Sequence, residues 1–231
     1  MPAFRLADGL FRRMFANEQR KIAPRGDNRF DDGRGQEIGR VDPMEPTVLK
    51  DVSKIGPPLT DIPTLRRRAR LRMEEGAVTA GYAADREVVI KLLNEALATE
   101  IVCVLRYKRH YFMAAGIHAA SVAAEFLEHA NEEMLHADRI AERIVQLRGE
   151  PNFSPEGLAV RSHAEYIEGG TLREMLRENL IAERIAIESY REMLGYLGEQ
   201  DPTTRRMLEE ILASEEEHAE DLSSLLEGLS G

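Results

Sequence analysis

Two stretches of the chain, EEMLHADRIAERI at Glu132–Ile144 and SEEEHAEDL at Ser214–Leu222, each place a glutamate three residues before a histidine. In an α-helix, residues three apart lie on the same face one turn from each other, so such a pair can hold one cation from a single helix. Glutamate is frequent in this chain, and one pair alone would be weak evidence. The two pairs are Glu133 with His136 and Glu215 with His218.

The two pairs belong to halves of the sequence that repeat one another. LATEIVCVLRY and LIAERIAIESY match in register, each with a glutamate among apolar residues and a tyrosine seven residues later, Tyr107 or Tyr190. Glu100 lies 33 residues before the first pair, and Glu183 lies 32 residues before the second. If each half is a helical hairpin, every early glutamate lies level with its later partner. Each tyrosine lies about two turns from its glutamate, on the same helix face.

Helical periodicity from Asp85 onward predicts four long helices. The third begins with a capping box, in which a threonine cap is followed by a glutamate three residues later. The fourth begins with a cap followed by proline, a typical first helical position. The segment GEPNFSPEGLAVRSHAEYIEGG, between the second and third helices, is too long for a tight hairpin and could contain a short helix. Short, long and short connections predict an all-α four-helix bundle with one long crossover. The expected helices span roughly 85–115, 119–148, 171–198 and 201–228.

This bundle would bring four carboxylates and two imidazoles together in its interior. Each lone charge in a low-dielectric core loses several kcal/mol of solvation, so buried carboxylates need cations. Two divalent metal ions would cancel all four negative charges. Carboxylate with imidazole suits iron or manganese better than structural zinc, which prefers thiolates in a closed tetrahedral site. The predicted metal ligands are Glu100, Glu133, His136, Glu183, Glu215 and His218.

Four segments together resemble the helices of bacterioferritins, a branch of the ferritin-like superfamily. They are LNEALATEIVCVLRY, EEMLHADRIAERI, LIAERIAIESYREMLGYLG and EEILASEEEHAEDL, and the resemblance covers roughly residues 88–228. It implies a ferritin-like bundle with two iron ions in each subunit. It also implies a ferroxidase, which oxidises Fe²⁺ with O₂ or H₂O₂ for iron storage or for protection from oxidative stress.

The resemblance assigns a role to each ligand. Glu133 and Glu215 would bridge the two irons. Glu100 with His136 would be terminal on one iron, and Glu183 with His218 on the other. Manganese in place of iron, or a peroxidase-type reaction, would use the same ligands, because the sequence does not fix the metal.

Three further residues near these ligands receive separate interpretations. Tyr107 occupies the family's position for a tyrosine beside the di-iron site and is the predicted catalytic residue. Met134 falls where bacterioferritins carry the methionine that ligates an intersubunit haem, but methionine is also a common filler at helix interfaces. His129 lies seven residues before His136 and lacks a glutamate three residues before it, so we interpret it as a core or interface histidine.

Residues 1–84 differ in composition from residues 85–231, the predicted bundle domain. Residues 1–84 hold 16 Lys and Arg against 12 Asp and Glu, whereas the remainder holds 15 against 29. Seven of the ten prolines lie before residue 64. We expect an extension that is mostly disordered, or an arm with short helices in FRLADGLFRRMF and TLRRRARLRMEEG. Its arginines allow an alternative function, a Dps-like protein that protects DNA through the arm.

Composition and chain ends set the remaining expectations. Apolar runs are too short for a membrane span, so no membrane association is expected. The single cysteine, Cys103, rules out an intrachain disulfide and favours the cytoplasm. The sequence stops just after the fourth helix, without the fifth short helix of 24-subunit shells. The resemblance implies a homo-oligomer, and the missing fifth helix favours a dimer or a 12-subunit shell over a 24-mer.

Overall fold

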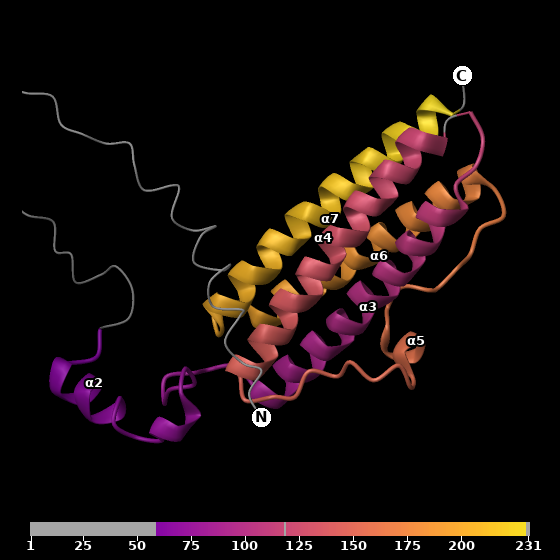
Figure 1. Cartoon of the computed structure of the whole chain (residues 1–231). Helices are drawn as coiled ribbons and strands as arrows, with labels where there is room; N and C mark the ends of the chain where they lie inside the picture. Colours follow the sequence, from indigo (N-terminus) through magenta and orange to yellow (C-terminus); the bar gives the residue numbers. More distant parts are fainter. Residues whose placement is uncertain (1–58, 118, 230–231) are drawn as a thin grey trace, which may run out of the picture. The chain divides into compact units, whose positions relative to one another are not determined.

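A computed structural model of the protein describes residues 59–117 and 119–229. It confirms the all-α four-helix bundle with one long crossover (Figure 1). Two short helices were expected in the extension. The first, FRLADGLFRRMF, lies outside the described residues. Part of the second, TLRRRARLRMEEG, is helical. The long helices are α3 (Arg86–Met113), α4 (Ala119–Gln146), α6 (Leu172–Leu197) and α7 (Pro202–Gly228); the short ones are α2 (Ile62–Arg68), the 3₁₀ turn η2 (Met73–Glu75) and α5 (Leu158–Arg161).

Side-chain caps explain where the long helices begin. The carboxylate of Asp85 accepts hydrogen bonds from the backbone N–H groups of Glu87 and Val88 at the start of α3. The predicted capping box between Thr171 and Glu174 opens α6, with both of its hydrogen bonds formed. Such caps satisfy backbone donors that have no partner inside the helix.

The crossover between α4 and α6 runs along the length of the bundle, so α6 starts at the end where α4 starts (Figure 1). The short helix α5 lies in this crossover. A fully buried arginine, Arg106 on α3, attaches the crossover to the bundle. Its guanidinium donates to the side-chain oxygen of Asn179 at 2.9 Å and to the backbone oxygen of Glu165 at 2.8 Å. These bonds compensate for removing the charge from water.

The apolar core is divided into two clusters. The first contains Leu97, Ile144 and Leu208, and the second contains Phe126 and Leu176. Each of the four long helices contributes residues to both clusters and carries an acidic residue between the two contributions. The candidate metal ligands therefore form a polar layer inside the bundle, with apolar packing on both sides.

The segment before α3 contacts the bundle through a few side chains. Val78 is buried in the first apolar cluster. The hydroxyl of Tyr82 donates to Asp201 at 2.9 Å. Asp201 also caps α7 and accepts from the guanidinium of Arg143 at 2.9 Å. These contacts hold residues near the start of α3 against the end of the bundle where α7 begins.

The arginine-rich stretch around α2 is not one continuous helix. Arg72 adopts the left-handed conformation, with φ of 49°, and separates α2 from the 3₁₀ turn. The α-helix stops at Arg68, so it includes Leu65 but not Met73. Both side chains are exposed.

Candidate metal centre

All six predicted ligands converge in the middle of the bundle. Each side chain comes from one of the four long helices, and none is more than 6% exposed. Their donor atoms form two groups, and within each group the atoms lie within 4.8 Å of one another. The first group is Glu100, Glu133, His136 and Glu215; the second is Glu133, Glu183, Glu215 and His218.

Two glutamates belong to both groups. Glu133 on α4 and Glu215 on α7 supply donor atoms to each group, as a pair of bridging carboxylates would. The predicted terminal residues divide between the groups in the predicted way, one glutamate and one histidine in each. The geometry therefore offers two adjacent groups of four side chains that share two carboxylates.

Each histidine points its Nδ1 atom at the carboxylates of its own group. His136 Nδ1 lies 3.4 Å from Glu100, 3.2 Å from Glu133 and 3.0 Å from Glu215. His218 Nδ1 lies 3.5 Å from Glu133, 3.9 Å from Glu183 and 3.7 Å from Glu215. The two imidazole rings are 6.1 Å apart between centroids. The two groups thus lie side by side, and in each of them one imidazole Nδ1 atom faces three carboxylates.

Several buried polar atoms in the centre make no hydrogen bond. A buried acceptor without a partner costs about 1–3 kcal/mol or more when it is charged, and native proteins contain few such atoms. All of these atoms belong to the converging side chains, and bound cations would give them partners. The donor set therefore fits divalent metal ions of the iron and manganese class. The atoms are Glu100 Oε2, Glu133 Oε1, Glu183 Oε2, both carboxylate oxygens of Glu215, and His218 Nδ1.

Protons and hydrogen bonds balance the charges of the centre when it holds no metal. Burial, together with neighbouring carboxylates, raises the pKa of Glu100 to about 8 and the pKa of Glu183 well above its usual value. Burial and the neighbouring Glu215 carboxylate tend to raise the pKa of Glu133, but close polar contacts with Glu100, His136 and His218 outweigh them and lower this pKa.

For the two histidines, burial and the neighbouring carboxylates shift the pKa in opposite directions. Burial favours a neutral imidazole, but the carboxylates around each ring outweigh burial and raise the pKa of His136 and of His218 to about 12. A metal ion needs a neutral imidazole nitrogen and ionised carboxylates as ligands. Metal binding must therefore displace protons from this centre.

Two tyrosines hold the terminal carboxylates from across the bundle. The hydroxyl of Tyr107 on α3 donates to Glu183 on α6, and the hydroxyl of Tyr190 on α6 donates to Glu100 on α3. Burial, together with these carboxylates, raises the pKa of both phenols, so each remains a neutral donor. The sequence predicted that each tyrosine lies on the same face as the glutamate of its own helix. In the structure, each tyrosine hydroxyl instead donates its hydrogen bond to the glutamate of the other hairpin. Tyr190 has no role in the site predicted from the sequence, although the repeat places it at the position equivalent to Tyr107.

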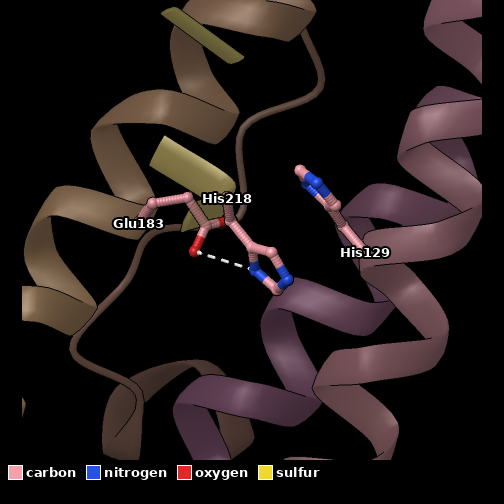
Figure 2. A group of neighbouring side chains, drawn as sticks. All are labelled: His129, Glu183 and His218. Atoms are coloured by element: carbon pink, nitrogen blue, oxygen red, sulfur yellow. Dashed lines mark ion pairs between the residues drawn. The ribbon is translucent and has the colours of Figure 1, made fainter. Parts of the chain in front are cut away.

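Two residues outside the predicted set contact His218. Glu132 Oε2 lies 2.6 Å from His218 Nε2, the ring nitrogen that faces away from the centre. The ring of His129 stacks on the ring of His218, with centroids 4.1 Å apart and planes 20° apart (Figure 2). His129 is buried, as expected for a core histidine, but it lies directly beside the centre. Its helical register with His136 was the only indication in the sequence.

Met134, the candidate haem ligand, lies elsewhere on α4. Its side chain is 42% exposed and points away from the buried layer. A surface position is compatible with either an interface filler or a ligand shared with a second subunit.

Fold and site together define a class of protein: helical bundles with a buried layer of carboxylates and imidazoles that could hold metal ions. The chain belongs to the ferritin family, because the family model for the ferritin-like domain matches residues 90–231. This is an iron-handling family, and the similarity runs to its bacterioferritin branch.

Individual relatives support this assignment. Bacterioferritin BfrA of Mycobacterium tuberculosis is 34% identical over 140 residues, which cover 60% of this chain and 84% of that protein. Bacterioferritin of Desulfovibrio desulfuricans is 32% identical over 141 residues, covering 60% of this chain and 75% of its own length. A solved structure described as a dodecameric thioferritin, the bacterioferritin-related protein of Bacteroides fragilis, is 33% identical with a TM-score of 0.62, covering 64% of this chain and 89% of that one.

Within the described residues, no helix is both long enough and apolar enough to cross a membrane.

Proposed function

We propose that the protein is a ferroxidase, which binds two Fe²⁺ ions as substrate in the buried centre and oxidises them. The observation that carries this proposal is the pair of adjacent four-ligand groups sharing Glu133 and Glu215. Shared carboxylates hold two ions close together, so that one oxidant molecule can take an electron from each. The bacterioferritin relatives support the choice of iron.

The electrons and protons balance with either oxidant. Two Fe²⁺ ions lose one electron each; O₂ takes two electrons and two protons to give H₂O₂, or H₂O₂ takes two electrons and two protons to give two water molecules. Four carboxylates favour the product, because their negative charge stabilises Fe³⁺ more than Fe²⁺. The burial of the site strengthens this effect by excluding water.

The side chains around the ligands keep the centre in shape for this reaction. Tyr107 and Tyr190 each occupy one oxygen of a terminal glutamate and leave its other oxygen facing the metal positions. Glu132 contacts the outer nitrogen of His218 and leaves Nδ1 directed inward. A carboxylate in that position fixes the orientation of a histidine ligand and increases its basicity.

The proposal is tested by mixing Fe²⁺-loaded protein with O₂ and following the appearance of Fe³⁺ by absorbance. Changing a partner of a ligand typically costs about 10–100-fold in metal affinity or activity, so Glu215→Ala should cost at least that. Glu217→Ala, an exposed glutamate two residues away on α7, is the matched control and should oxidise iron at the wild-type rate. Equal rates in the wild type and Glu215→Ala would refute the proposal.

The metal itself is tested separately, because manganese uses the same donors. Protein purified from cells grown with equal iron and manganese should contain mainly iron. Predominant manganese, together with turnover of H₂O₂ without Fe²⁺ oxidation, would support the peroxidase-type alternative instead.

We also propose a homo-oligomer, with a 12-subunit shell or a dimer in preference to a 24-mer. The dodecameric description of the Bacteroides fragilis protein supports the shell. The mass of the protein in solution, measured by light scattering, distinguishes twelve subunits from two and from twenty-four.

DNA binding through the arm is a second candidate function. The five arginines between residues 66 and 72 are all exposed on and after α2, as phosphate contacts require. Retardation of DNA should then weaken steeply as salt increases. No retardation of DNA by the full chain at low salt would exclude this function and leave the ferroxidase proposal intact.

A further inference from the structure

A second histidine–carboxylate group lies beside the metal centre. It contains Glu125 and His129 from α4 and Asp221 from α7, whose donor atoms lie within 4.8 Å of one another. His129 Nε2 is 3.2 Å from Glu125 Oε1 and 3.9 Å from Asp221 Oδ2. One ring nitrogen thus faces two carboxylates that come from different helices.

The other nitrogen of the same ring is already engaged. His129 Nδ1 lies 3.2 Å from the hydroxyl of Tyr107. This contact fixes the ring so that Nε2 points toward Glu125 and Asp221. A surface ion pair within one helix would need only Glu125, at i and i+4, and does not explain the approach of Asp221 from α7. One nitrogen and two carboxylate oxygens from two helices are a typical donor set for a divalent transition metal ion.

The group combines a buried ligand with access to solvent. His129 is almost completely buried, whereas the side chains of Glu125 and Asp221 are 29% and 47% exposed. An ion held there would keep open positions for water on its outer side. On its inner side the ring of His129 stacks on His218, so the group adjoins the dinuclear centre directly (Figure 2).

His129 also links the two groups through shared neighbours. His129, Glu183 and His218 have donor atoms within 4.8 Å of one another. Figure 2 draws these three side chains, with the ion pair between Glu183 and His218 marked. A cation leaving the outer carboxylates would therefore meet ligands of the dinuclear centre after a very short displacement.

We infer that Glu125, His129 and Asp221 form a third divalent-cation site, from which Fe²⁺ is delivered to the dinuclear centre. The delivery role rests on the proposed ferroxidase function, but binding at the third site does not. Binding and delivery are therefore measured separately.

Binding is measured with Co²⁺ alone, added to the full-length protein without oxygen and counted by equilibrium dialysis. The wild type should bind three ions per chain. Asp221→Asn and Glu125→Gln keep the shape of each side chain, remove one ligand charge and should bind two. Glu220→Gln removes the same charge from an exposed neighbour on α7 and should still bind three.

Two results would overturn the third site. Two ions in the wild type would show that only the dinuclear centre binds. Three ions in both Asp221→Asn and Glu125→Gln would show that these carboxylates are not ligands. Either result leaves the ferroxidase proposal untouched, because that proposal is tested at Glu215.

Delivery is measured as the dependence of oxidation rate on Fe²⁺ concentration. Asp221→Asn should require several-fold more Fe²⁺ for half-maximal rate while the rate at saturating Fe²⁺ stays at the wild-type value. An unchanged half-maximal concentration would overturn the delivery role. Loss of the saturating rate would also overturn it, because Asp221 would then act in the reaction itself.

Discussion

The hydroxyl of Tyr107 on α3 donates a hydrogen bond to the carboxylate of Glu183 on α6. The bond joins the two hairpins across the candidate metal centre, and its counterpart in the repeat runs in the opposite direction between Tyr190 and Glu100. Glu183 and Glu100 thereby each have one oxygen held by a phenol, whereas the other oxygen makes no hydrogen bond. The duplicated sequence has produced a centre whose two halves are held by each other's tyrosines.

Replacing one tyrosine should weaken one metal position more than the other. Tyr107→Phe removes the partner of Glu183, and Tyr190→Phe removes the partner of Glu100. A buried acceptor left without its donor costs about 1–3 kcal/mol, so each variant should lose roughly tenfold or more in affinity at its own position. Calorimetric titration with Co²⁺ measures this, with the half-exposed Tyr196→Phe as control. Equal weakening at both positions in both variants would contradict the reciprocal arrangement.

In metal-free protein, replacing Glu183 or Glu133 by glutamine should lower the free energy of unfolding by different amounts, because the two carboxyl groups differ in charge. Glu183 has a strongly raised pKa and is protonated, so Glu183→Gln should leave the free energy of unfolding nearly unchanged. Glu133 has a lowered pKa and faces both imidazoles, so Glu133→Gln should destabilise by about 3 kcal/mol. Urea unfolding with a chelator present compares them. A larger loss in Glu183→Gln than in Glu133→Gln would contradict the assigned charges.

Metal binding should release protons and strengthen as pH rises. His136 and His218, with pKa values of about 12, and Glu100, at about 8, hold protons in the metal-free centre. Each proton displaced strengthens binding by about tenfold per pH unit. Co²⁺ affinity measured from pH 6 to pH 8 should therefore increase, with proton release detected in weakly buffered solution. An affinity independent of pH would contradict the protonated centre.

A separate pH dependence of stability should come from His110. Burial and nearby Arg106 lower its pKa to about 4, below the value of about 6.5 expected when unfolded. Because the unfolded chain binds the proton more readily, His110 stabilises the fold above pH 6.5 and loses this contribution as pH falls toward 4. The loss is on the order of 3 kcal/mol.

His110→Gln isolates this contribution, since glutamine does not titrate and its amide can still donate to the backbone oxygen of Glu168, as His110 does at 2.9 Å. Its melting temperature should fall less than that of the wild type between pH 7 and pH 4. His163→Gln, at an exposed position, serves as control and should follow the wild type. A wild-type pH slope in His110→Gln would show that other groups cause the loss.

Much of this centre could be predicted from the sequence because helix geometry is regular. A glutamate and a histidine three residues apart share a face wherever the helix packs, and the repeat fixed which glutamates lie level. Caps at Thr171 and Asp201 likewise determined where α6 and α7 begin, since they satisfy local backbone donors.

Contacts that depend on the relative rotation of two helices could not be predicted in this way. Tyr107 faces Glu183 and not Glu100 because α3 and α6 pack with these faces together. The stacking of His129 on His218 and the approach of Asp221 depend on how α4 and α7 pack. Arg72, which interrupts the arginine-rich segment, adopts a left-handed conformation that no residue pattern indicated.

We propose that the six converging side chains bind two metal ions, with Glu133 and Glu215 between them. Anomalous diffraction at the iron absorption edge, from crystals loaded with Fe²⁺ without oxygen, tests it most directly. We predict two iron peaks inside the bundle, one beside His136 and one beside His218, each in contact with both bridging glutamates. A single peak, or no peak within this cluster, would show that these side chains do not bind a pair of metal ions.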